Sequence, residues 1–507
     1  MITNNIGRIA SEQQFFSQTR TSLATSLGPT ERKTLSLQVL TRSEPVSHLA
    51  QNHGVSRKFL YQQATKASDA LNEAFAPSAD NDRVLFYLPV TKNWIRQFVL
   101  ALILICHSSF RGILELLEAV FDYNKLSLGT IHNIVQQAVQ KAKQINGAQY
   151  LSGIDVGIPD EIFQARQPVL VGMDARSTYC YLLSAEDQRD ETTWGVHLLD
   201  LAAQGLHPDY TIADGGRGLR AGQAAAWDDV PCHGDVFHAE RDLGKLAFFL
   251  ENRAAGCTTM RQKLERKMNR AKNKGKGRPL SKKLAYARQA EEQAIELAKN
   301  IRTLADWMQN DILSLAGPDL QSRRELYDFV VEELRTLESL CPYRITPVLR
   351  MLENNRDNLL AFVGILDERF ADIAARFNVP LFLVHAICEL QGLDKNFARY
   401  WQRRAPLQKK LQGQFHDVET AVCEVLSETP RASSMVENLN SRLRNYFFLR
   451  RHIGNDYLDL LRFFLNHRRF MRSERIERVG KSPAELLTGK QHSHWLELLG
   501  FERFSRN

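Results

Sequence analysis

Residues 433–444 read Ser433-Ser434-Met435-Val436-Glu437-Asn438-Leu439-Asn440-Ser441-Arg442-Leu443-Arg444. The pattern predicts the start of a helix, with Ser433 or Ser434 as the N-cap and Glu437 completing a capping box. Residues three and four positions apart share one face of a helix. The polar side chains that share a face here are Glu437, Asn440, Ser441 and Arg444. The apolar side chains on the opposite face are Val436, Leu439 and Leu443.

The polar face of this helix admits two interpretations. A carboxylate followed two turns later by a guanidinium suits a metal-dependent site that acts on nucleic acid. In such a site Glu437 would hold a divalent ion and Arg444 would meet a phosphate. The alternative is a capped amphipathic helix whose charged face is only solvated. The rest of the chain has to decide between them.

The basic residues of the chain are concentrated in blocks. The chain has 507 residues and a formal net charge of +8, and its length predicts two to four domains. Residues 261–283 hold eleven Lys and Arg against one acid, and residues 441–478 hold ten Arg against four acids. Local basic blocks in an otherwise balanced chain predict a polyanionic partner, most often nucleic acid.

Cysteine usage and hydropathy indicate the compartment. The seven cysteines show no paired Cys-x-x-Cys spacing, which predicts a reducing compartment and neither a disulfide frame nor a structural zinc site. The N-terminus lacks the basic-then-apolar pattern of a signal peptide. The longest apolar run, residues 98–106, is far short of a membrane span. We therefore expect a cytoplasmic protein with no membrane partner.

Residues 30–70 predict a helix-turn-helix unit. Helices are expected over 32–40 and 46–53, with Gly54 ending the second and Ser56 capping a third. A short turn with Gly before an N-capped, polar-faced helix is how a recognition helix is presented to the major groove, although a plain three-helix bundle has the same pattern. The candidate DNA-binding residues are Arg57, Lys58, Tyr61 and Gln62.

A second unit of the same kind follows a segment of linker composition at 77–82. Apolar helices are expected over 92–106 and 110–123, and Ser127 caps a further helix that carries Thr130 and His132. Two such patterns in tandem favour a pair of DNA-binding units over a plain helical bundle. Double-stranded DNA is then the expected partner. Thr130 and His132 are the candidate DNA-binding residues of this second unit.

The periodicity changes to that of strands at residue 150. Strands are expected over 150–163, 169–173, 178–184, 210–214 and 230–235, with helices over 191–204 and 219–227. The order β-β-β-α-β-α-β is that of the ribonuclease H-like fold, a mixed α/β fold with carboxylates at the ends of two adjacent central strands.

Residues 247–430 predict an all-helical insertion. Helices are expected over 282–308, 322–340, 345–377, 380–390 and 405–428. The basic segment 270–279 contains Gly and Pro, which predicts a loop. Its candidate DNA-binding residues are Arg270, Lys272, Lys274, Lys276 and Arg278, and a solvated charge run is the alternative.

Three acids are candidates for a metal site. Asp214 ends a strand at a Gly-Gly turn, Glu437 comes from the helix that begins near 433, and a third acid is expected on the first strand beside Asp214. Asp160 is the preferred third acid, and Asp174 and Asp155 are the alternatives. Three carboxylates suffice to hold two Mg²⁺ ions, for which Mn²⁺ can substitute, and such a pair promotes phosphodiester cleavage and transesterification.

Five segments carry a more specific pattern. They are Asp160-Glu-Ile-Phe163, Ala213-Asp-Gly-Gly-Arg-Gly-Leu219, Ser434-Met-Val-Glu-Asn-Leu-Asn-Ser-Arg442, Leu465-Asn-His-Arg-Arg-Phe470 and Gly480-Lys-Ser-Pro-Ala-Glu-Leu-Leu487. Together they resemble bacterial insertion-sequence transposases of the DDE type. The long separation of Asp214 from Glu437 is similar to the branch with a helical insertion, which includes Mutator-like and hAT-like enzymes. Members of that branch carry a Cys/Asp-x-x-His signature, which Asp235-Val-Phe-His238 matches.

The resemblance implies roles for several of these residues. Asp160, Asp214 and Glu437 would bind the metal pair, and Arg444 would contact DNA, with Arg442 on the same helix as a further DNA-binding residue. His238 would lie next to the metal site, although a half-buried structural histidine is the alternative. The chain would bind the terminal inverted repeats of its element and the target DNA, as a homodimer or higher oligomer.

The resemblance also implies a multidomain arrangement. Helix-turn-helix domains are expected over 1–82 and 83–149, the first part of a ribonuclease H-like catalytic domain over 150–246, the insertion over 247–430, and the closing helices of the catalytic domain with a C-terminal tail over 431–507. Two other functions fit the same sequence: a non-catalytic DNA-binding regulator derived from a transposase, and a junction-type nuclease that would not join DNA ends.

Overall fold

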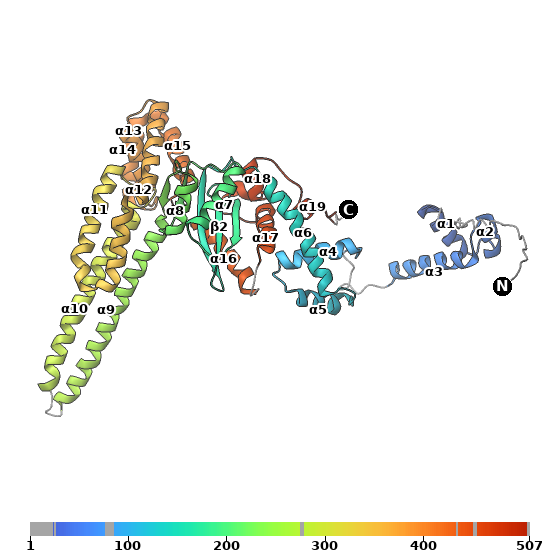
Figure 1. Cartoon of the computed structure of the whole chain (residues 1–507), viewed down its shortest axis with the longest axis horizontal. Coiled ribbons are helices and arrows are strands. Elements are labelled where there is room, and N and C mark those ends of the chain that lie inside the picture. The colour runs from blue at the N-terminus through green and yellow to red at the C-terminus, as the bar shows by residue number, and fades with distance from the viewer. Residues whose placement is uncertain are drawn as a thin grey trace, which may run out of the picture. The chain divides into compact units, whose positions relative to one another are not determined.

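The computed structural model describes residues 24, 27–76, 86–273, 278–431, 434–449 and 454–503. The described chain is mostly helical and contains one five-stranded mixed sheet (Figure 1). It separates into two compact units, residues 1–89 and 90–507. In the described parts, none of the helices is both long and apolar enough to cross a bilayer.

The described part of the first unit consists of three helices around a small apolar core. The helices are α1 (Pro29–Leu40), α2 (Val46–Asn52) and α3 (Arg57–Ala74). Leu35, Leu49 and Leu60 are its buried centre. Gly54 adopts a positive φ of 63°, which ends α2. The Ser56 hydroxyl accepts a hydrogen bond from the backbone N–H of Phe59 at 3.1 Å, so the expected N-cap of α3 is confirmed.

The second unit is built on the sheet. Its strands are β1 (Val156–Gln164), β2 (Gln167–Asp174), β3 (Cys180–Ala185), β4 (Tyr210–Ala213) and β5 (Cys232–Gly234). They lie in the order β3-β2-β1-β4-β5. β1 runs antiparallel to β2 and parallel to β4, β2 runs antiparallel to β3, and β4 runs parallel to β5. β2 is buried along nearly all its length, which is why its sequence is continuously apolar instead of alternating.

Different helices cover the two faces of the sheet. One face shares a core with α4 (Lys92–Leu104), α5 (Phe110–Phe121), α6 (Leu128–Ala148), α16 (Ser434–Leu449) and α17 (Asn455–His467). The other face packs against α7 (Glu191–Ala203) and α8 (Arg217–Ala226). α7 and α8 approach closely because Gly222 lies at their crossing, where a Cβ would come within 2.6 Å of the Cβ of Trp194. The helices expected as a second DNA-binding unit therefore pack into the same core as the sheet.

Two asparagines of α17 pair with the backbone of the edge strand β3. Asn466 accepts from the N–H of Cys180 and donates to its carbonyl, both at 2.8 Å. Asn455 does the same at Ala185, at 2.7 and 3.1 Å. These amides satisfy backbone groups that an edge strand would otherwise leave open to another chain.

Between β5 and α16, the described residues form helices and the turns that join them. The helices are α9 (Val236–Lys272), α10 (Arg278–Trp307), α11 (Leu320–Leu337), α12 (Pro342–Phe377), α13 (Leu381–Gln391), α14 (Ala398–Leu411) and α15 (Phe415–Glu428). α9 and α10 form a long antiparallel hairpin beside the other helices (Figure 1). The chain ends with α18 (Pro483–Thr488) and α19 (Trp495–Leu498), and Ser482 and Glu485 form the capping box of α18.

A buried arginine, Arg323, holds the turn before α11 in place. Its side chain is 1% exposed and donates to the carbonyls of Pro318 at 2.7 Å, Ile312 at 2.8 Å and Leu315 at 3.2 Å, as well as to that of Ser314. Burial lowers the pKa of Arg323 to about 10, so the guanidinium remains charged at neutral pH. Carbonyl dipoles surround this cation, and among the described residues no carboxylate forms an ion pair with it.

Three expectations about the elements are wrong. The first strand begins at Val156, not at 150, because a turn precedes it. The basic segment 270–279 is not a loop where it is described: α9 continues to Lys272 and α10 begins at Arg278. The single helix expected over 405–428 is two helices, α14 and α15, separated where Gln412 adopts a positive φ of 47°.

Candidate active site

Asp160 lies on β1, and Asp214 directly follows the neighbouring parallel strand β4. The register of β1 and β4 pairs Val156 with Tyr210 and Gly157 with Thr211. Continuing this register by three residues along each strand places Asp160 opposite Asp214. The two carboxyl groups are close enough that the charge of Asp214 raises the pKa of Asp160. Of the three candidates Asp160, Asp174 and Asp155, Asp160 is therefore the one that lies beside Asp214.

The environment of Asp160 disfavours its charged form. Burial is the largest cause that raises its pKa to about 6, and the neighbouring Asp214 adds to the effect. Two hydrogen bonds act in the opposite direction: the backbone N–H of Glu161 donates at 2.8 Å, and the side-chain amide of Asn440 donates at 2.7 Å. A cation placed between these carboxylates would remove the repulsion.

The other two candidates for this acid have different roles. Asp174 is buried at the end of β2, where its carboxylate accepts hydrogen bonds from the N–H of Ser177 at 2.7 Å and from the N–H of Arg176 at 3.3 Å. It is thus a turn former, as an Asp in this position often is. Asp155 is exposed just before β1, with its carboxylate 4.0 Å from the guanidinium of Arg176.

Helix α16 docks against the sheet on the side of Asp160. Its apolar residues Val436, Leu439 and Leu443 are buried, as the spacing predicts. Asn440, one turn after Glu437, is also buried and makes the 2.7 Å bond to Asp160. This contact joins segments far apart in the sequence and fixes the position of Glu437 near the sheet. The residues expected to cap α16 include Ser433, which lies outside the described residues.

Two guanidinium groups and one imidazole surround Glu437. Its carboxylate lies 3.4 Å from a guanidinium nitrogen of Arg241, 3.7 Å from one of Arg444 and 3.9 Å from Nε2 of His238. Arg444 is the basic residue two turns after Glu437, so the spacing places it as expected. Sequence reasoning missed Arg241, although it follows His238 by three residues on α9 and so shares its helix face.

His238 links the acids to the start of α9. Its Nδ1 is hydrogen-bonded to the carboxylate of Asp235, and the other carboxylate oxygen caps α9 by accepting from the N–H of Phe237 at 2.9 Å. Burial lowers the pKa of His238, but the bond to Asp235 and the charges of Asp235 and Asp160 outweigh it and raise the pKa overall. The imidazole is therefore positioned on one side by Asp235 and faces the acids on the other.

Further arginines lie near Asp214. One carboxylate oxygen of Asp214 accepts from the N–H of Gly216 at 2.9 Å, and its backbone carbonyl accepts from Arg220 at 3.1 Å. The negative charge of Asp214 also acts on Arg189. Gly218 permits this arrangement, because a Cβ there would lie 2.2 Å from the carbonyl of Arg189. Arg220 lies six residues after Asp214 and contacts it locally, whereas Arg189 approaches the site only through the fold.

The donor set of this site fits a hard divalent cation. Mg²⁺ prefers oxygen ligands and retains several waters, and the available donors are carboxylates. The side-chain oxygen of Asn440 is buried without a hydrogen-bond partner beside Asp160. Among the described residues, no three His, Cys, Asp or Glu side chains are already gathered as metal ligands, because Glu437 is turned to its cationic neighbours. Ion binding would therefore require Glu437 to exchange these partners.

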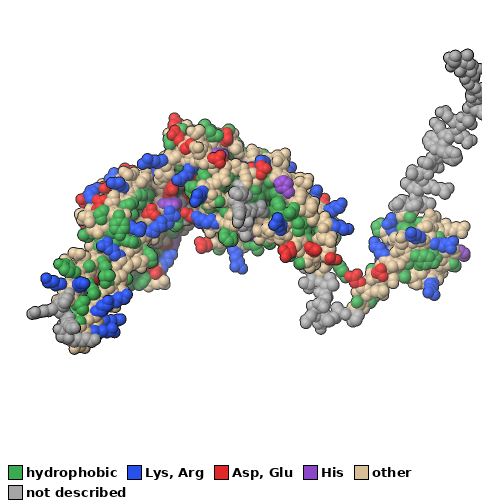
Figure 2. Space-filling view, turned by 60° about the horizontal axis from the view of Figure 1, so that its bottom comes forward, with side chains coloured by type: hydrophobic (Ala, Val, Ile, Leu, Met, Phe, Trp, Pro, Cys, Tyr) green, Lys and Arg blue, Asp and Glu red, His purple; other side chains and the backbone are tan. Residues whose placement is uncertain are grey.

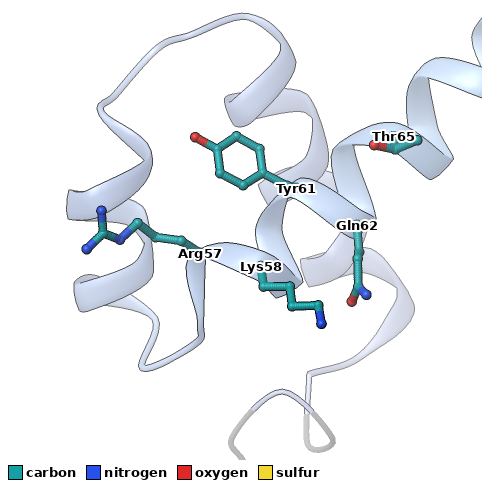
Figure 3. A pocket seen from close by; sticks show the side chains of 5 residues that line it. All are labelled: Arg57, Lys58, Tyr61, Gln62 and Thr65. Atoms are coloured by element: carbon teal, nitrogen blue, oxygen red, sulfur yellow. The ribbon is translucent and has the colours of Figure 1, made fainter.

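The expected DNA-binding residues lie on several different helices of the chain. Arg57, Lys58, Tyr61 and Gln62 line a shallow hollow on the exposed side of α3, together with Thr65 (Figure 3). Thr130 and His132 are exposed near the start of α6. Arg270 is exposed near the end of α9; Lys272 ends the same helix, Arg278 begins α10, and Lys274 and Lys276 lie outside the described residues. Lys and Arg side chains gather toward the far end of the α9–α10 hairpin (Figure 2).

Arg442 lies on a different face of α16 from Glu437. Burial lowers its pKa, the nearby positive charge of Arg468 lowers it further, and Tyr446 and Cys180 are also close enough to influence it. These neighbours belong to the core between α16, α17 and β3. This position indicates that Arg442 packs within the fold, whereas Arg444 is exposed.

A scan against protein-family models finds no match to this chain, and a search of curated proteins finds no similar sequence.

Proposed function

We propose that this protein is a DDE-type DNA transposase with a ribonuclease H-like catalytic core. The observation that supports the proposal most is the convergence of Asp160, Asp214 and α16. Asp160 on β1 lies opposite Asp214, which directly follows the parallel strand β4, and α16 is joined to Asp160 by the hydrogen bond from Asn440, one helical turn after Glu437. The strand order β3-β2-β1-β4-β5 and the long helical insertion before α16 support the same assignment.

Each residue of the site would have its own role in phosphodiester cleavage and strand transfer. Asp160, Asp214 and Glu437 would hold the ions. A pair of Mg²⁺ ions, when bound, activates the attacking oxygen and stabilises the leaving oxygen. Arg241 and Arg444, which neutralise Glu437 in this structure, would turn to the phosphates of the DNA. His238, held by Asp235, would donate a hydrogen bond to a phosphate oxygen.

Purified protein incubated with DNA that carries the ends of its element, Mg²⁺ and a target plasmid tests this proposal. The expected result is cleavage at the element ends and their covalent joining to the plasmid. A DNA-binding regulator would bind the ends without cutting them. A junction-type nuclease would cut DNA without joining it, and either result would contradict the proposal.

Asn440 offers a prediction about positioning. Asn440→Ala removes the hydrogen bond to Asp160 and is expected to lower the rate of DNA cleavage by about 10- to 100-fold, as is typical of groups that orient metal ligands. DNA affinity should stay the same, since Asn440 is buried. The neighbouring exposed Ser441→Ala is the matched control and should retain the cleavage rate. Equal rates in the two variants would contradict this role.

Helix α3 offers a prediction about DNA recognition. The N-terminal residues of a recognition helix contact the groove, so Arg57→Gln is expected to weaken binding to the element ends by about 10-fold. Lys66→Gln removes one positive charge from an exposed position two turns further along α3 and serves as the control. Fluorescence anisotropy with labelled end DNA measures both, and a similar loss in the two variants would argue against a recognition role for α3.

A further inference from the structure

A large cleft lies away from the candidate active site. Its volume is about 940 Å³, and several segments line it, chiefly the end of the sheet where β1 and β4 begin, the end of α15 with the chain that follows it, and residues 475–491. Asp155, on its wall, precedes Asp160 by five residues, which is about 16 Å along a strand. Met435, in the first turn of α16, also lines the cleft. Helix α16 thus borders both the cleft and the candidate active site, which are two separate places on the protein.

The lining of this cleft is cationic. Seven Lys and Arg side chains line it, against four acids. One of the four, Glu485, is buried and pairs with Arg469, which is not among the lining residues, at 2.7 Å. The acids that remain are Asp155, which lies 4.0 Å from Arg176, Glu428, which lies 3.8 Å from Arg369, and Glu477. A surplus of positive charge is therefore left on the wall formed by residues 475–491.

Two arginines on that wall are fixed by backbone carbonyls. Arg475 donates to the carbonyl of Ser427 at 3.2 Å, and Arg478 donates to the carbonyl of Arg176 at 2.7 Å. The charge of Arg475 adds to burial in lowering the pKa of Arg478, and the charges of Glu477 and Asp174 act in the opposite direction. These carboxylates offset part of the repulsion between the guanidinium groups of Arg475 and Arg478, and a phosphate oxygen in the cleft would offset more of it. Lys481 and Lys490, which are exposed in the same cleft, add two flexible cations.

We propose that this cleft binds the phosphodiester backbone of DNA. The proposal rests on the proposed function and adds a second DNA-binding surface to it, separate from the acids and from α3. Rigid guanidinium groups suit phosphate oxygens, and flexible lysines suit a backbone whose sequence varies. An open cleft lined by several segments fits a polymer better than a small anion, which would need an enclosed pocket.

The salt dependence of DNA binding tests the proposal. For each DNA phosphate that the protein no longer neutralises, the slope of log K against log salt concentration becomes shallower by about 0.9. The double variant Lys481→Gln/Lys490→Gln removes two exposed cations and is expected to make the slope shallower by about one to two, measured in EDTA with a random-sequence duplex. Arg475→Gln/Arg478→Gln should have a similar effect, and circular dichroism checks that this second variant remains folded.

The control removes two positive charges elsewhere in the second unit. Arg335 pairs with Glu353 at 2.7 Å and Arg356 pairs with Asp328 at 2.8 Å, so Arg335→Gln/Arg356→Gln should leave the slope unchanged. Coinciding slopes for wild type and the lysine variant would overturn the proposal. A wild-type protein that binds no DNA would instead refute the proposed function, so the two failures are distinguishable. The assay contains EDTA and no Mg²⁺, so no cleavage is expected in it. The measured slope therefore reports DNA binding alone.

Discussion

Asp160→Asn is expected to abolish Mg²⁺-dependent DNA cleavage while making the metal-free protein more stable. The loss of cleavage should exceed about 100-fold, since even groups that only orient metal ligands cost 10- to 100-fold when removed. The gain in stability has a separate cause. Burial and Asp214 raise the pKa of Asp160 to about 6, so the folded protein carries an unfavourable charge at neutral pH that an amide does not carry.

The pH dependence of stability follows from the sign of this shift. Between about pH 4 and pH 6 the folded state retains a proton on Asp160 that the unfolded chain has lost, so the free energy of unfolding falls as pH rises. Above pH 6 the penalty is constant, at most about 3 kcal/mol for a shift of roughly two pKa units. Asp160→Asn removes this penalty. The unpaired side-chain oxygen of Asn440 can accept from the new amide if the side chain of Asn440 flips.

Thermal unfolding at pH 5 and pH 7.5, with and without Mg²⁺, measures these effects. Asp160→Asn should unfold at a higher temperature than wild type at pH 7.5, with a smaller difference at pH 5, and Mg²⁺ should stabilise only the wild type. Asp209→Asn is the control, because Asp209 is exposed just before β4 and should change neither stability nor cleavage. Cleavage retained by Asp160→Asn would exclude this residue as a metal ligand.

Glu437→Gln is expected to give the same loss of cleavage with DNA binding retained. This variant separates the binding of Mg²⁺ by residue 437 from its contacts with Arg241 and Arg444. An amide can still contact the two arginines, but it is a poor ligand for Mg²⁺. Gel-shift assays and strand-transfer assays on the same preparation measure the two properties. Strand transfer at the wild-type rate would exclude Glu437 from the metal site.

Arg323→Ala is expected to cause the largest loss of stability in the helical insertion. The substitution leaves four buried or partly buried carbonyls without their donor, each at a cost of about 1 kcal/mol, and it leaves a cavity as well. We expect the free energy of unfolding to fall by about 3 kcal/mol or more. No acid or base of the candidate active site touches Arg323, so the effect should appear as unfolding and not as a changed cleavage mechanism.

The adjacent Arg324 provides a matched control. Its guanidinium lies 3.4 Å from the carboxylate of Asp357, in an ion pair whose two side chains are 41% and 62% exposed. Such pairs contribute little, so Arg324→Ala should change the free energy of unfolding by less than about 1 kcal/mol. Urea denaturation followed by far-UV circular dichroism compares the two variants. Similar midpoints for both would show that the carbonyls around Arg323 find other donors.

The sequence by itself determined the features that depend on neighbours within one turn of helix or one strand. Ser56 and Ser127 cap their helices as predicted, and the apolar stripe of α16 is buried as its spacing requires. Such features follow from hydrogen bonds and side-chain directions over three or four residues. The position of Arg444 near Glu437 belongs to the same class, because two helical turns separate them.

The tertiary structure alone decided which distant groups meet. The register of β1 on β4 sets Asp160, and not Asp155 or Asp174, opposite Asp214, and a shift of one residue would turn Asp160 to the other face of the sheet. The docking of α16 brings Asn440 to Asp160, and the course of α9 brings Arg241 to Glu437. Local patterns do not predict these contacts, because each depends on how two separately formed elements pack across the core.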